Sequence, residues 1–336
     1  MDLSTHYLGL DLTSPLVPSA SPLSRGLDTC RQLEDAGAGA IILWSLFEEA
    51  LTAETETSAR FLSEQHTGFA EAADFLPNYH DYPPALDNYL EHLRRLKEAL
   101  GIPVIASLNG VTVGGWVAHA RALEAAGADA LELNVYYVAA NPEESGAQVE
   151  ERYLDLLGAL RHQVSLPINM KLSPNFSSVA NMVKRLEAAG ADGVALFNRF
   201  YQPDINLDSL RLRPALYPST SPESLLAMRW IALLYGRVEL SLGATGGVHT
   251  AEDALKLLLA GADVVHLCSL LLRDGPGALR LVREGIEGWM AEQGFETLAD
   301  FRGRMSALAV PNPAEFERGN YVQVLDSYRA SSGVLV

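Results

Sequence analysis

One short phrase occurs four times in this chain, and it constrains the possible folds more than any other feature. Each copy consists of the end of a helical pattern, a turn close to Ala-Gly-Ala-Asp and an apolar run, and the turns contain Gly37, Gly127, Gly190 and Gly261. Glycine commonly ends a helix, because it adopts a left-handed backbone without steric cost. An apolar run directly after it is typical of a parallel strand covered on both faces. The repeat therefore predicts successive helix–strand units.

Apolar runs between these copies complete a pattern of eight strands. The predicted strands begin near residues 16, 40, 103, 130, 167, 193, 239 and 264, and they alternate with predicted helices that include 86–100, 150–163 and 222–235. This alternation predicts a (β/α)8 TIM barrel formed by residues 1–336 as a single domain. An open doubly wound sheet is the alternative. Long connections follow the second, fourth and sixth strands, on the face where barrel enzymes keep their sites.

The turns after the last two predicted strands carry small residues. Gly246-Gly247 follows the seventh strand and Cys268-Ser269 follows the eighth. In TIM barrels these two loops are the usual phosphate site, because glycine lets backbone N–H groups approach an anion closely. Thr250 stands at the expected start of the next helix. Gly246-Gly247 can also be read as a tight turn without a ligand, and the repeat favours the phosphate site.

Polar residues at the ends of the other strands are expected to point into the same site. Lys171 is the most informative of them, because it closes an apolar strand in which a lysine is costly unless an anion or a ligand accompanies it. A lysine that reaches the rim is the alternative. Asn134 and Asn198 end the flanking strands, where their amides could contact a ring with donors and acceptors. The remaining polar residues at strand ends include Ser19, Ser45, Ser107, Cys268 and Ser269.

Composition narrows the class of ligand. The chain has 336 residues and a formal net charge of −17, which argues against nucleic acid and anionic membranes as partners. Its two cysteines, Cys30 and Cys268, belong to no CxxC pair, and its histidines are scattered, so we expect reduced thiols and no metal. No apolar run reaches ~18 residues, and the first residues lack the basic region of an export signal. We therefore expect a cytoplasmic protein that acts on a small molecule.

A phosphate site, a central lysine and flanking amides together suit a phosphorylated planar cofactor such as FMN. Lys171 would stabilise negative charge that develops on the ring.

At these residues the chain resembles the dihydroorotate dehydrogenases, and the soluble class 1 enzymes most closely. The resemblance covers most of the length, with Tyr7–Leu10, Glu132–Asn134, Met170–Pro174, Gly243–Val248 and Gly294–Gly303 as its motifs. It implies a flavin-dependent dehydrogenase of pyrimidine biosynthesis that acts on a CH–CH bond, and expected homodimers. It also implies FMN, held by Ser107, Asn134, Lys171, Gly246, Gly247 and Ser269.

The substrate half of the motif departs from the family. Where the family has Leu-Ser-Cys-Pro-Asn with a Cys or Ser base, this chain has Val135 to Ala139, so Tyr137 falls at the base position and Ala139 at an orotate-binding Asn. Trp44 aligns with the family's flavin-bordering lysine, and Ala72 stands where another amide is expected. A free Tyr has a pKa near ~10 and is a poor base at neutral pH. Tyr137 is therefore a weak candidate for the acid/base, with Asp74 or His80 as substitutes on loop closure.

Three functions fit these observations. The first is an FMN-dependent oxidoreductase with an altered substrate, in which Lys171 and Tyr137 are the catalytic candidates and Asn134 and Asn198 bind substrate. The second is a non-redox, phosphate-binding barrel isomerase or lyase, in which Lys171 serves as acid/base. The third is a flavin binder without catalysis. A tRNA-reducing flavoprotein with the same fold is disfavoured by the net charge of −17.

Overall fold

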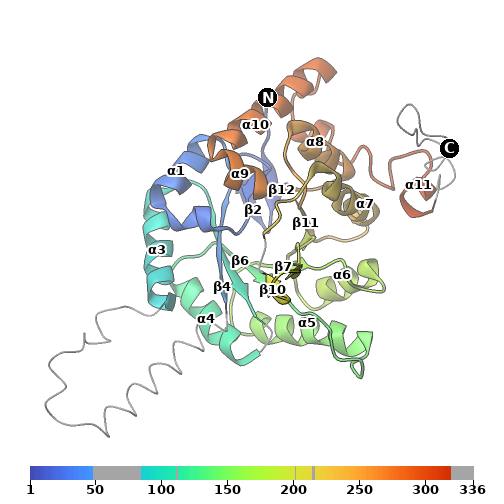
Figure 1. Cartoon of the computed structure of the whole chain (residues 1–336). Helices are drawn as coiled ribbons and strands as arrows, with labels where there is room; N and C mark the ends of the chain where they lie inside the picture. Colours follow the sequence, from blue (N-terminus) through green and yellow to red (C-terminus); the bar gives the residue numbers. More distant parts are fainter. Residues whose placement is uncertain (48–84, 111–112, 201, 214–215, 319–336) are drawn as a thin grey trace, which may run out of the picture.

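Eight parallel strands form the centre of the computed structural model, which describes residues 1–47, 85–110, 113–200, 202–213 and 216–318 (Figure 1). The strands are β3 (Leu16–Pro18), β4 (Ile41–Phe47), β5 (Val104–Asn109), β6 (Ala130–Asn134), β7 (Ile168–Leu172), β8 (Gly193–Leu196), β11 (Ser241–Thr245) and β12 (Val264–Leu267). Their spatial order is β3-β12-β11-β8-β7-β6-β5-β4. The first and last strands thus pair, and the Gly39 N–H donates to the Leu16 carbonyl (2.9 Å) where β4 approaches β3. The predicted TIM barrel is confirmed, and the open sheet is excluded.

Helices surround the strands on the outside of the barrel (Figure 1). They are α1 (Leu27–Asp35), α3 (Ala85–Ala99), α4 (Val113–Ala125), α5 (Gly146–Arg161), α6 (Val179–Ala188), α7 (Ser224–Leu234), α8 (Ala251–Ala260), α9 (Ser269–Asp274) and α10 (Gly277–Gln293). Helix α5 begins four residues earlier than predicted, because Ser145 and Gln148 form a capping box. Thr250 caps α8 as predicted, with its side chain accepting the Asp253 N–H.

The glycines of the repeated phrase adopt the backbone that the sequence predicts. Gly37, Gly127, Gly190 and Gly261 have φ of +100°, +93°, +95° and +119°. Each ends a helix and turns the chain into the next buried strand. Here only glycine combines a helix end with a left-handed turn at low cost.

The aspartates that follow three of these glycines connect neighbouring strands. The Oδ2 atoms of Asp129, Asp192 and Asp263 accept N–H groups from the first or second residue of the preceding strand, at 2.7, 2.8 and 2.7 Å. Each carboxylate also pairs with a cation. The first copy has Gly39 at this place, because an added Cβ would lie 2.0 Å from the Ser14 carbonyl oxygen.

Asp129→Ala should lower the free energy of unfolding by about 1–3 kcal/mol, because the Val104 N–H loses a charged acceptor. Equilibrium unfolding in urea measures this. Asp28→Ala is the control, because Asp28 is highly exposed and its pair with Arg31 spans 3.6 Å. An equal loss in both variants would contradict the role of the repeated aspartate.

A short hairpin closes the N-terminal end of the barrel. It comprises β1 (Thr5–Tyr7) and β2 (Leu10–Leu12), and Tyr7 and Leu8 are buried beneath the strands. The Leu8 N–H donates to Ser241 Oγ (2.9 Å) at the start of β11. The polar strand ends therefore face the opposite end of the barrel.

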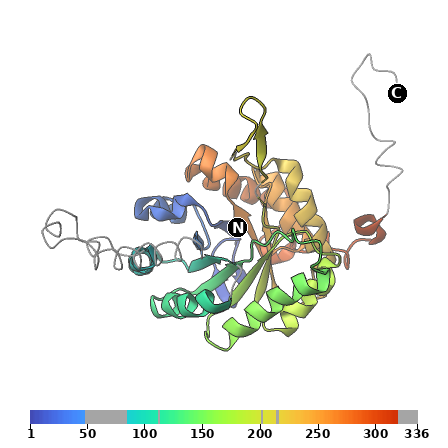
Figure 2. The same ribbon diagram turned by 60° about the horizontal axis from the view of Figure 1, so that its bottom comes forward.

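The long connection after β6, residues 135–145, lies within the described residues. The long connection after β8 contains a second hairpin, β9 (Asp204–Asn206) and β10 (Arg211–Arg213), which projects from the body as the olive hairpin in Figure 2. Most of the connection after β4, with Ala72, Asp74 and His80, lies outside the described residues. Within the described ranges, no helix has the length and apolar composition needed to cross a membrane.

Candidate functional site

A cavity of about 570 Å³ lies at the C-terminal ends of the strands. Its size falls within the range typical of cofactor and ligand sites. Polar residues from separate strands and loops meet around it. They include Ser19, Lys171, Asn198, Ser219, Thr245, Cys268 and Ser269, and the backbone of Gly246 and Gly247 lies among them. Six of the residues predicted to bind a cofactor thus line one cavity, although they come from four separate parts of the sequence.

The two glycines after β11 have different surroundings. A Cβ on Gly246 would meet no atom within 4 Å, so this glycine faces open space with φ +97°. A Cβ on Gly247 would lie 2.3 Å from the Ser224 backbone nitrogen and 2.9 Å from the Thr220 carbonyl oxygen. The absence of a side chain at Gly247 therefore lets the backbone of the loop before α7 pack closely against it, whereas the absence of one at Gly246 leaves room for a ligand.

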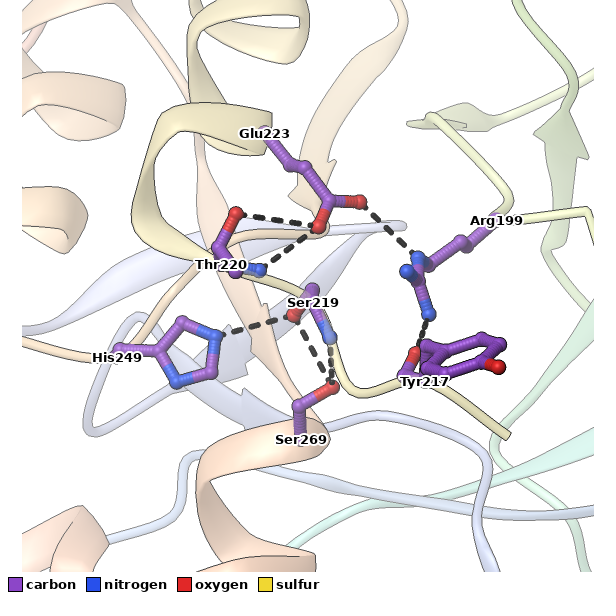
Figure 3. Close-up of polar contacts among 7 residues, drawn as sticks. All are labelled: Arg199, Tyr217, Ser219, Thr220, Glu223, His249 and Ser269. Atoms are coloured by element: carbon purple, nitrogen blue, oxygen red, sulfur yellow. Dashed lines mark hydrogen bonds and ion pairs between the residues drawn. The ribbon is translucent and has the colours of Figure 1, made fainter. Parts of the chain in front are cut away.

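Ser219, in the loop before α7, contacts Ser269, the first residue of α9 (Figure 3). The Ser219 N–H donates to Ser269 Oγ (3.1 Å), and the Ser219 hydroxyl donates to the same atom (3.0 Å). His249 Nε2 lies 3.1 Å from Ser219 Oγ. Sequence reasoning identified Ser269 and missed Ser219 and His249. A serine just before a predicted helix was the available signal for Ser219.

Arg199 holds the same loop from the other side (Figure 3). Its Nε donates to Glu223 Oε2 (3.0 Å), and its Nη1 donates to the Tyr217 carbonyl. Glu223 also accepts the Thr220 N–H (2.8 Å). Hydrogen bonds therefore hold the segment 217–223 in place, and its residues Tyr217, Pro218 and Ser219 line the cavity.

Lys171 lies at the floor of the cavity and is almost fully buried. Its Nζ donates to Ser19 Oγ (3.2 Å) and to Glu132 Oε1 (3.3 Å). Asn169 Nδ2 donates to the other oxygen of Glu132 (3.4 Å). Sequence reasoning missed Glu132 and Asn169. The signal was present, since each lies two residues before a predicted site residue and therefore on the same face of its strand.

Two further groups at the floor are neutral. Burial, and secondarily the charge of Lys171, lowers the pKa of His266 to about 3. Burial raises the pKa of the Cys268 thiol. Neither ring nitrogen of His266 has a hydrogen-bond partner, although the ring lines the cavity and is buried. Cys30 and Cys268 are both free thiols.

Three of the predicted cofactor residues, Ser45, Ser107 and Asn134, do not line the cavity. Asn134 Oδ1 accepts a hydrogen bond from Asn198 Nδ2 (2.7 Å), so the two predicted amides form a pair. Ser45 and Ser107 contact each other through their hydroxyls (2.8 Å) within the barrel. Trp44 packs against Tyr89 on α3. The pairing of β4 with β5 is irregular between Ile42 and Ser45, the stretch that contains Trp44.

Tyr137 does not line the cavity. Its hydroxyl donates to Glu144 Oε2 (2.5 Å), and the Arg152 guanidinium lies 4.8 Å from the ring centroid. The hydrogen bond to Glu144 raises the pKa of Tyr137. This arrangement favours the protonated phenol, which can donate a proton but is a poor base.

The charge of the cavity lining contrasts with that of the chain. Among the described residues, the lining contains Lys171, Arg199 and Arg273 and no aspartate or glutamate, although the chain carries a net charge of −17. Each of these cations is paired with a carboxylate that does not line the cavity, Glu132, Glu223 or Asp274. A ligand therefore meets the cationic member of each pair first, which suits an anionic group.

Comparison with known proteins places these residues in a family. The family model for dihydroorotate dehydrogenase matches residues 2–290. The chain is 26% identical over 318 residues to the catalytic subunit of dihydroorotate dehydrogenase B (NAD(+)) from Methanothermobacter thermautotrophicus, covering 90% of this chain and 97% of that protein. It is 27% identical over 327 residues to the NAD-dependent dihydropyrimidine dehydrogenase subunit PreA of Escherichia coli K12, covering 92% and 78%. It is 33% identical over 221 residues to a putative dihydroorotate dehydrogenase A (fumarate) of Aeropyrum pernix, covering 63% and 70%.

Proposed function

The chain belongs to the dihydroorotate dehydrogenase family, and on this premise we propose that it is an FMN-dependent oxidoreductase that acts on a CH–CH bond of a small cyclic substrate. The cavity carries this proposal, because it joins a glycine-lined phosphate space to Lys171 with no acidic residue in its described lining. Gly246 and the Ser269 end of α9 would hold the phosphate. Lys171 would lie beside the ring.

The residues divide into a cofactor half and a substrate half. FMN, when bound, supplies the acceptor for hydride from the substrate carbon. Lys171 stabilises negative charge on the ring, and the pair Asn134–Asn198 binds the polar edge of the substrate. Oxidation of the substrate also requires a base that takes a proton from the neighbouring carbon. Tyr137 is the candidate acid/base from the sequence, but its hydroxyl donates to Glu144 and it does not line the cavity, so it is poorly suited to accept that proton.

The extracted cofactor and its absorption spectrum test this function. A yellow protein that releases FMN on denaturation supports the proposal, and a colourless protein favours the isomerase or lyase. A yellow protein that no reduced pyrimidine or related cyclic compound bleaches favours a flavin binder without catalysis.

Dihydroorotate should be a poor substrate at neutral pH even when flavin is bound. Tyr137 occupies the base position with a raised pKa, and Ala139 cannot supply an amide contact. The missing base should slow the chemical step by ~10²–10⁴-fold, and each lost hydrogen bond to a buried ring atom should cost about 1–3 kcal/mol. Anaerobic mixing with dihydroorotate measures bleaching of the flavin band without an electron acceptor.

Photoreduction of the same sample is the control for this experiment, because it shows that the flavin can be reduced. Bleaching by dihydroorotate at ~1 s⁻¹ or faster would contradict the prediction. It would direct the search for a base to Asp74 and His80.

The form of the enzyme is part of the proposal. A cytoplasmic protein agrees with the free thiols of Cys30 and Cys268. A homodimer agrees with the exposed apolar side chains Ile205, Leu207 and Leu212 on the β9–β10 hairpin. The names of the relatives support a role in pyrimidine metabolism, which depends on the substrate.

A further inference from the structure

Glu132 is a carboxylate buried inside the barrel below the cavity. Its side chain has 0% exposure, that of Lys171 has 7%, and the two groups are 3.3 Å apart. Asn169 also donates a hydrogen bond to Glu132, and Lys171 also donates one to Ser19. An isolated buried charge is costly, so each member of this buried ion pair stabilises the charged form of the other.

The titratable groups that face the buried ion pair from other elements are neutral at neutral pH. Burial and the Lys171 charge hold the pKa of His266 on β12 at about 3. Burial raises the pKa values of Tyr7 and Tyr89 far above neutrality, and Glu132 raises both further. Burial also raises the pKa of Cys268. Among these groups, only the buried ion pair carries charge.

We propose that Glu132 is the positioning residue for Lys171: its carboxylate keeps the ammonium protonated and directed at the cavity. Lys171 lines the cavity whereas Glu132 does not, so a ligand meets the cation first. Identification of the ligand as flavin rests on the proposed function, and the pairing itself does not.

Glu132→Gln leaves the Lys171 ammonium buried without its counter-charge, so Lys171 loses its proton in the folded protein. When a reductant such as dithionite places two electrons on the bound flavin, the new negative charge draws one proton from solvent back to Lys171 Nζ. In the wild-type protein Glu132 supplies the counter-charge throughout, so we expect no proton uptake at this site on reduction.

The first experiment uses the protein stripped of flavin. Thermal unfolding should show that Glu132→Gln and Lys171→Met each lower the midpoint, while the double variant recovers most of the loss, because it removes both charges together. Between neutral and alkaline pH the stability of Glu132→Gln should rise relative to wild type, because the unfolded chain then binds the proton that folded Lys171 has lost. Additive losses in the double variant would overturn the pairing.

The second experiment uses the flavin-loaded protein. The midpoint potential of Glu132→Gln should fall more steeply with pH than that of wild type, by about 30 mV per pH unit, which is one proton per two electrons. Glu132→Asp should restore the wild-type slope. Asn169→Ala is the control, because it removes a hydrogen bond to Glu132 without changing charge.

In the Lys171→Met background, Glu132→Gln should leave the slope unchanged, because no group then takes up the proton. An unchanged slope in the single variant would overturn the inference. A wild-type protein that binds no flavin would refute the proposed function alone, and the unfolding experiment would still decide whether the ion pair exists.

Discussion

Lys171→Met should yield a folded protein that still binds flavin but reduces it about 10²–10³-fold more slowly, the cost of removing one preorganised group that stabilises developing charge. Methionine keeps the length of the side chain and removes the charge. The midpoint potential of the flavin should also fall in this variant, because the negative charge on the reduced ring loses its nearest cation. Stopped-flow reduction and potentiometric titration measure the two effects.

The buried ion pair complicates this variant in a predictable way. Lys171→Met leaves Glu132 buried without its cation, which typically costs about 3–5 kcal/mol of stability. The variant Lys171→Met/Glu132→Gln avoids this loss and should show the same slow reduction in a more stable protein. Wild-type reduction rate and potential in both variants would place Lys171 away from the flavin.

Gly246→Ala should give a folded but largely colourless protein. The added Cβ points into open space at the proposed phosphate position. Each charge-assisted hydrogen bond lost from the phosphate is worth about 1.5–3 kcal/mol, or roughly 10- to 100-fold in affinity. Flavin occupancy after purification and the dissociation constant for added FMN measure the effect.

Gly294→Ala is the matched control for backbone strain. Gly294 has φ +75° and also lacks neighbours within 4 Å, but it caps α10 outside the cavity. Both variants should lose stability by about 1–2 kcal/mol from the left-handed backbone, and only Gly246→Ala should lose flavin. Full occupancy in Gly246→Ala would refute the phosphate assignment. Gly247 is less informative, because its Cβ would meet the Ser224 backbone.

The sequence predicted the barrel because its information about the fold is local. A glycine at each helix end and an apolar run after it determine the units, and the φ values of Gly37 and Gly261 agree. The loops after the seventh and eighth strands could be predicted to share one site, because all strands of a parallel barrel end on the same face. Lys171 stood out because a lysine in an apolar strand needs a partner.

That partner could not be read from the sequence. Glu132 is 39 residues from Lys171, and its contact arises because β6 and β7 are neighbours in register, with Asn134 opposite Lys171. The hydrogen bonds of Ser219 with Ser269, 50 residues away, likewise depend on the path of the loop before α7.

Local patterns thus determined the elements, their order and the end of the barrel at which polar residues gather. Only the tertiary structure decided which polar side chains meet, since those contacts join separate strands. It turned Tyr137 toward Glu144 and Trp44 toward α3, and it placed Ser45 against Ser107 outside the lining of the cavity. The physical reason is that glycine turns and apolar periodicity act over a few residues, whereas hydrogen bonds and charge pairs depend on positions that the whole barrel sets.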